Sequence, residues 1–168
     1  MIPLLTDYIN KTNVYSFNTT WTIDAPLEQS WDELLNYERW PEWCTPLEKI
    51  EALGQPDGVK KGHHIRSVWR GALPYTVCFN AVIKKVVPYS FLSFNVMGDL
   101  RGEGICHFLE SDAHTSVNFV WNVSPTKLWM RVSSPFARPI FIGNHDHIIE
   151  HTVHGLMRMI AHGNNGVS

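Results

Sequence analysis

The fold of this chain is decided by residues 134–163, which read SPFARPIFIGNHDHIIEHTVHGLMRMIAHG. Ser134 and Pro135 form an N-cap followed by a first-turn proline, and nothing stops a helix before Gly163. At 1.5 Å per residue, this stretch predicts a helix of roughly 40 Å. Because a helix of that length with one apolar face must cover something large, the rest of the chain has to supply a sheet.

The apolar residues of this predicted helix fall on one face. A narrow arc contains Ala137, Phe141, Ile148, Thr152, Gly155 and Met159, with Asn144 beside it, and Ile149, Leu156 and Ile160 widen the apolar side. The polar residues Asp146, His147, Glu150, His154 and Arg158 lie opposite or at its edge. Glycine costs roughly 1 kcal/mol relative to alanine in a helix. We therefore expect Gly155 to be buried close to the sheet, at a kink or against a bulky neighbour such as a strand tryptophan.

Seven segments before this helix carry strand signals. Apolar and polar residues alternate over Tyr15–Ile23, which is typical of a half-buried strand. The six further segments are Leu47–Leu53, His63–Arg70, Tyr75–Val86, Phe91–Val96, Gly104–Leu109 and Ser116–Val123. The breaks between them are short and contain turn residues, such as Pro56-Asp57-Gly58 and Gly71-Ala72-Leu73-Pro74. Connections this short predict an antiparallel meander, so the fold class is α+β.

Two short helices are expected directly after the first strand. At Ala25-Pro26 the period changes, and Leu27, Trp31, Leu34 and Leu35 follow helical spacing. Pro41 then breaks this helix and starts a second short one in the phrase Trp40-Pro41-Glu42-Trp43.

The composition describes one folded domain. The 168 residues carry a net charge of −2, 44% of them are hydrophobic and only 18% are charged. This length is near the modal domain size, so we expect a single domain over residues 1–168. The near-neutral charge excludes an electrostatic footprint for nucleic acid. No apolar run approaches the ~20 residues of a membrane span, and the N-terminus lacks a signal-peptide pattern, so a cytoplasmic location is expected.

The cysteine and aromatic content adds two observations. Cys44, Cys78 and Cys106 are an odd number of widely spaced cysteines, which predicts free thiols in a reducing compartment. The chain contains 7 Trp, 5 Tyr and 8 Phe, and such side chains line cavities as well as fill cores.

Several phrases resemble the START-like (SRPBCC) helix-grip superfamily, in its polyketide cyclase/dehydrase and lipid-transport branch. They are Trp21-Thr-Ile-Asp-Ala25-Pro26, Glu28-Gln29-Ser30-Trp31, Tyr37-Glu38-Arg39-Trp40-Pro41-Glu42-Trp43, Gly98-Asp99-Leu100-Arg101-Gly102-Glu103-Gly104, and Asn144-His145 followed by Gly155-Leu156. The resemblance covers a core of about residues 12–162. It implies a curved antiparallel sheet of about seven strands wrapped around the long C-terminal helix. It also implies a deep pocket between the two. Members of the superfamily include ligand carriers, hormone receptors, chaperone activators and aromatase/cyclases, so fold alone does not assign function.

The candidate ligand-binding residues come from the long helix and from two strand tryptophans. They are Trp69, Trp121, Phe141, Asn144, His145, Ile148, Thr152 and Met159. The expected partner is a small hydrophobic or polyketide-like molecule, bound by a monomer or a homodimer. Ordinary core packing is the alternative for each of these residues.

A catalytic role has four candidates, His145, Asp99, Arg101 and Glu103. The three charged residues share one face if they lie in a strand, and that face either looks into the pocket or is solvated. If these groups converge in the pocket, a cyclase or dehydratase is favoured, with His145 as acid or base. If they do not, a non-catalytic lipid or small-ligand carrier or sensor is favoured.

No cofactor or metal is expected. His147, His151 and His154 share one stripe of the long helix, but no cysteine or carboxylate from elsewhere can be assigned to it. Gly102-Glu103-Gly104 lacks the third glycine and the following helix of a dinucleotide loop. These glycines are expected to relieve curvature in a bent strand.

Overall fold

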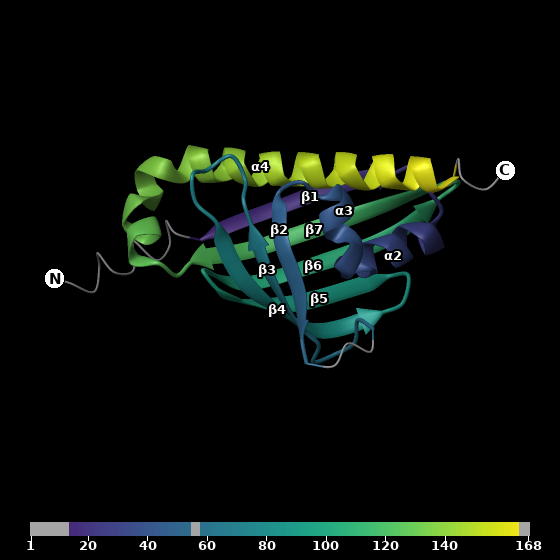
Figure 1. Cartoon of the computed structure of the whole chain (residues 1–168), viewed down its shortest axis with the longest axis horizontal. Coiled ribbons are helices and arrows are strands. Elements are labelled where there is room, and N and C mark those ends of the chain that lie inside the picture. The colour runs from purple at the N-terminus through teal and green to yellow at the C-terminus, as the bar shows by residue number, and fades with distance from the viewer. Residues whose placement is uncertain (1–13, 55–57, 165–168) are drawn as a thin grey trace.

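The architecture is one antiparallel sheet covered on one face by a long helix (Figure 1). The computed structural model describes residues 14–54 and 58–164. The seven strands are β1 (Tyr15–Ile23), β2 (Leu47–Leu53), β3 (His64–Trp69), β4 (Val77–Val87), β5 (Phe91–Gly98), β6 (Leu100–Ser111) and β7 (His114–Pro125). Their order in the sheet is β1-β7-β6-β5-β4-β3-β2. The predicted α+β fold is confirmed.

The helical elements connect and cover this sheet. They are α2 (Leu27–Leu35), a 3₁₀ turn at Tyr37–Arg39, α3 (Trp40–Trp43) and α4 (Leu128–Asn164). The α2–α3 segment carries the chain from β1 to β2, the two edges of the sheet. The two predicted short helices are therefore present.

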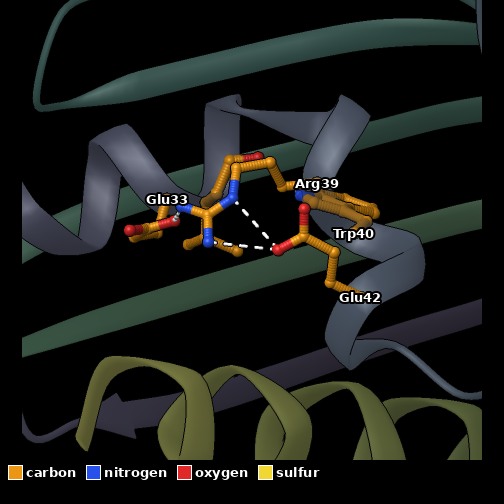
Figure 2. Close-up of polar contacts among 5 residues, drawn as sticks. Glu33, Arg39, Trp40 and Glu42 are labelled. Carbon is orange, nitrogen blue, oxygen red and sulfur yellow. Dashed lines mark hydrogen bonds and ion pairs between the residues drawn. The ribbon is translucent and has the colours of Figure 1, made fainter. Parts of the chain in front are cut away.

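Polar contacts fix the turn between α2 and α3 (Figure 2). The Arg39 guanidinium lies 3.1 Å from a Glu42 carboxylate oxygen and 3.5 Å from a Glu33 carboxylate oxygen. The Trp40 indole N–H donates a 3.1 Å hydrogen bond to the carbonyl oxygen of Leu34. Arg39 thus joins the end of α2 to α3 on the solvent side, while Trp40 is turned toward the interior.

α4 begins earlier than the sequence indicated. The helix starts at Leu128, so the predicted N-cap Ser134 lies inside it. Figure 1 shows that its first turns are set at an angle to the remainder, which runs along the sheet. Pro139 follows these turns, and a proline inside a helix removes one backbone hydrogen bond and bends it. The prolines in this stretch therefore accompany a bend rather than a helix start.

The main hydrophobic core lies under the second half of α4. Leu156 and Ile160 pack there with Trp43 of α3, Phe108 of β6 and Ile23 of β1. Leu156 and Ile23 are fully buried. The predicted apolar face of the helix is correct in this half.

The predictions for β1 and β2 are exact at both ends, β3 is one residue shorter at each end, and β4 begins two residues later and ends one residue later. β5, β6 and β7 extend beyond their predicted bounds, and β6 begins at Leu100 instead of Gly104. Gly102 lies before the predicted start of β6, but it pairs with Val96 and Val123 on either side. Within the turn predicted at residues 56–58, Pro56 and Asp57 lie outside the described residues.

Gly155 is buried, as predicted, but its neighbour is not a strand tryptophan. A Cβ atom built there would lie 2.0 Å from the carbonyl oxygen of Trp43 in α3. The bare helix backbone therefore lets α3 approach α4 directly. This contact explains why glycine occupies a buried helical position despite its low helix propensity.

We predict that Gly155→Ala lowers the free energy of unfolding by about 1 to 3 kcal/mol, because the added methyl group collides with backbone that cannot rotate away. Gly143→Ala is the matched control in the same helix, since nothing lies within 4 Å of its Cβ position. That variant should gain up to about 1 kcal/mol from helix propensity. Urea denaturation measures both, and stabilisation by Gly155→Ala would contradict the contact.

Candidate ligand-binding cavity

A cavity lies between the sheet and the part of α4 upstream of the main core. Its volume is about 300 Å³, at the lower end of the range for small-molecule sites. All seven strands contribute to its wall, together with the α2–α3 segment, the connection between β3 and β4, and α4. From α4 the lining residues are Met130, Phe141, Asn144, His145, Ile148, Ile149 and Thr152.

Aromatic side chains dominate the wall because strand alternation turns them inward. Four of the seven tryptophans line the cavity, namely Trp21, Trp40, Trp69 and Trp121. The Phe79 ring stacks parallel to that of Trp69 at 6.5 Å and lies 5.7 Å from that of Trp121. These rings form a continuous aromatic floor across the sheet.

Glycines of β6 make room for this floor. A Cβ atom at Gly104 would lie 2.3 Å from the Phe94 ring, which rests on the bare strand. A Cβ atom at Gly102 would lie 1.9 Å from the backbone oxygen of Asn122. We expected these glycines to relieve strand curvature. In the structure, glycine is required at Gly104 because the Phe94 ring lies against it, and at Gly102 because the backbone of the neighbouring strand does.

The lining residues that the structure describes include no Asp, Glu, Lys or Arg. Most of the polar groups in the wall are already bonded. The Trp69 indole donates to Ser67 Oγ at 2.8 Å, the Tyr37 hydroxyl lies 2.9 Å from His63 Nε2, and Thr152 Oγ1 donates to the Ile148 carbonyl at 2.7 Å. The cavity therefore suits an uncharged, largely apolar molecule.

His145 is the one histidine among the lining residues. Its imidazole stacks on the Phe17 ring at 3.7 Å, and its side chain is 12% exposed. Nδ1 lies 3.3 Å from a carboxylate oxygen of Asp146, whereas the buried Nε2 has no hydrogen-bond partner among the described residues. Burial lowers the pKa of His145, and the Asp146 carboxylate partly opposes this effect.

The connection between β3 and β4 closes one side of the cavity against α4. The Ala72 backbone N–H donates a 2.8 Å hydrogen bond to Asn144 Oδ1. Leu73 and Tyr75 of the same connection line the cavity. The Tyr75 hydroxyl oxygen is buried and, like His145 Nε2, has no partner among the described residues.

The structure brings most of the predicted ligand-binding residues to this cavity. Trp69, Trp121, Phe141, Asn144, His145, Ile148 and Thr152 all line it, and their part in binding stays a prediction. Met159 does not line it. It packs against the main core two helical turns beyond Thr152, because the cavity ends where α3 meets α4.

Asp99, Arg101 and Glu103 do not line the cavity. The inward positions of β6 are Leu100, Cys106 and Phe108, so the odd-numbered residues of the strand face the other way. Asp99 instead accepts a hydrogen bond from the Cys78 N–H at 3.0 Å and pairs with Lys127 at 2.9 Å. Glu103 lies 3.7 Å from Lys84. The possibility that this face meets His145 in the pocket is therefore wrong.

Several lining residues were not singled out in the sequence. Phe17 and Tyr75 are the most important, because one stacks on His145 and the other presents an unpaired hydroxyl. The period-two pattern of β1 already put Phe17 on the inward face. Cys106 also lines the cavity, and burial raises the pKa of its thiol to about 12, so it is protonated at neutral pH.

The histidine stripe of α4 lies away from the cavity. The His147 and His151 rings are 4.0 Å apart, and His151 and His154 are exposed. Within residues 14–54 and 58–164, no group of three His, Cys, Asp or Glu side chains is placed to hold a metal ion. None of the described helices is long and apolar enough to cross a membrane.

No protein-family model and no curated protein sequence matches this chain. Solved structures do match. The Zhui aromatase/cyclase from Streptomyces sp. R1128 has a TM-score of 0.69 at 14% identity, over 87% of this chain and 93% of that one. A START superfamily protein from Mycobacterium smegmatis has a TM-score of 0.69 at 12% identity, over 88% and 97% of the two chains. The di-domain ARO/CYC BexL has a TM-score of 0.68 at 17% identity, over 94% of this chain and 52% of that one. The chain therefore has the START-like helix-grip fold.

The lowered pKa of His145 predicts a pH-dependent stability. Between the ordinary value of 6.5 and the lower folded-state pKa, the unfolded chain binds more protons, so the free energy of unfolding falls as the pH is lowered through this range. His145→Phe should lose less stability than the wild type between pH 7.5 and pH 5.5. His154→Phe, at an exposed position, is the control. Urea denaturation at both pH values measures this, and equal losses in all three proteins would contradict it.

Proposed function

We propose that this protein binds a small, uncharged, largely apolar molecule in the cavity between the sheet and α4, as a non-catalytic carrier or sensor. The single observation that carries the proposal is the cavity wall, which is built from aromatic rings and contains no charged side chain among the described residues. A water molecule finds few hydrogen-bond partners in such a site, whereas an apolar ligand makes van der Waals contact with the surrounding rings.

The fold supports the same proposal in general terms. Three of the structures that share it are named as aromatase/cyclases or as a START superfamily protein. These names describe those proteins, and identities of 12 to 17% bring only the fold to this chain.

A cyclase or dehydratase is the second candidate, and His145 is the observation that favours it. Its imidazole lines the cavity and has an unpaired Nε2, so it could exchange a proton with a bound molecule. Arg101 and Glu103 lie on the opposite face of β6, and Asp99, just before this strand, contacts Cys78 and Lys127. None of the three lines the cavity beside His145. A carrier or sensor needs no such second group, and for this reason it is the preferred function.

Native mass spectrometry of the freshly purified protein is the first experiment. A retained small molecule of defined mass, released on unfolding, would support binding and identify the ligand. To separate the two candidate functions, the identified molecule is incubated with fresh protein and then analysed again. Only an enzyme would convert it into a different compound.

We predict that Phe141→Glu weakens the binding of the neutral fluorescent probe N-phenyl-1-naphthylamine by at least about tenfold. The substitution puts a carboxylate into an apolar wall that offers it no cation. His154→Glu introduces the same charge on the exposed face of α4 and should leave the affinity unchanged. Fluorescence titration measures the affinities, and thermal melts verify that both variants are folded. Equal affinities for the two folded variants would place the site elsewhere.

A further inference from the structure

We propose that the cavity selects neutral aromatic molecules that carry a hydroxyl group, and that this hydroxyl donates a hydrogen bond to His145 Nε2 and accepts one from the Tyr75 hydroxyl. The proposal rests on the proposed function and specifies the chemistry of its ligand. It concerns the end of the cavity where α4 meets the connection between β3 and β4.

The position of the proton on the His145 imidazole decides what Nε2 can bind. A carboxylate oxygen can only accept a hydrogen bond, so the 3.3 Å contact with Asp146 assigns a proton to Nδ1. Burial favours the neutral imidazole, which carries one proton. Nε2 is therefore a bare acceptor. It is buried without a partner among the described residues, so a ligand that satisfies it must bring a donor.

A second polar group, the Tyr75 hydroxyl, lies on the connection between β3 and β4. The Tyr75 hydroxyl is also buried without a partner among the described residues, and it can donate a hydrogen bond. The Tyr75 segment and His145 belong to the same end of the cavity, because Ala72 of this segment is bonded to Asn144, the neighbour of His145. A hydroxyl group both donates and accepts, so one such group can satisfy both atoms.

The two atoms discriminate against other polar groups on the ligand. A ketone or an ether oxygen accepts from Tyr75 but cannot donate to Nε2. A carboxylate or phosphate finds no Lys or Arg among the described lining residues. The flat imidazole, stacked 3.7 Å from Phe17, continues the aromatic wall and suits an aromatic body on the ligand.

Access to the two atoms requires a movement of the 70–76 segment. Both atoms are buried in this structure. The hydrogen bond from Ala72 to Asn144 holds the segment against α4. The entering ligand displaces the Tyr75 ring, and its hydroxyl then takes the position between the two walls. Trp21 Nε1 is another buried donor without a described partner, but Trp21 lies four residues beyond Phe17 on β1, a backbone separation of about 13 Å, and takes no part.

Three probes of nearly equal shape test the proposal: naphthalene, 2-methoxynaphthalene and 2-naphthol. The wild-type protein should bind 2-naphthol about tenfold more tightly than 2-methoxynaphthalene, since both oxygens accept from Tyr75 but only the hydroxyl donates to His145 Nε2. His145→Phe keeps a flat ring on Phe17 and should reduce this ratio to about one while naphthalene still binds. Tyr75→Phe removes only the donor hydroxyl and should reduce the preference for 2-naphthol over naphthalene about threefold, while the ratio of 2-naphthol to 2-methoxynaphthalene stays the same. His151→Phe, at an exposed position on the same helix as His145, should retain both preferences.

Isothermal titration calorimetry at pH 7.5 gives the dissociation constants. Equal binding of all three probes by the wild type would overturn the hydroxyl proposal and leave the apolar-ligand function standing. A tenfold ratio of 2-naphthol to 2-methoxynaphthalene that survives His145→Phe would also overturn it, because the hydroxyl would be bound elsewhere. Failure of every probe to bind would overturn the proposed function together with this inference.

Discussion

The contact between the Trp43 carbonyl and the bare backbone of Gly155 is the constraint on which the rest of the structure depends. α3 is a short helix held to α2 by Arg39, so its position is set by the chain that crosses from β1 to β2. Because Gly155 has no side chain, α4 comes down onto α3 at this point. Leu156 and Ile160 then reach the main core. The position of α4 over the sheet follows from this one close approach.

The cavity is the consequence upstream of this contact. One end of α4 is fixed against α3, whereas the part from Phe141 to Thr152 crosses over aromatic rings that stand on the sheet. Those rings pack against one another, as Phe79 does with Trp69 and with Trp121. Because each rigid ring packs against its neighbours in the plane of the sheet, it cannot rotate to fill the space above the sheet. The helix therefore spans a space that the aromatic floor leaves open.

Much of the fold could be predicted because its signals are local. The period of two along β1 and the helical phase of Phe141, Ile148 and Thr152 each depend on neighbouring residues, and they put these side chains on the correct face. The face of Asp99, Arg101 and Glu103 could not be predicted in this way. It is set by the register of β6 against β5, in which Phe94 pairs with Gly104, and such pairing joins residues distant in sequence. The early start of α4 was missed because Pro135 and Pro139 are equally typical of a helix start and of a bend.

The distribution of polar groups bears on whether the cavity binds or catalyses. A proton transfer within a bound molecule needs an acid and a base that both face it, or one group that changes charge readily at the working pH. Among the described lining residues His145 is the one imidazole, the thiol of Cys106 is protonated at neutral pH, and no carboxylate is present. The burial that lowers the pKa of His145 also keeps its imidazole neutral, and a neutral imidazole with its proton on Nδ1 offers a fixed acceptor at Nε2. A fixed acceptor in an apolar wall recognises a donor without moving the proton, and this supports the proposed binding function over the catalytic alternative.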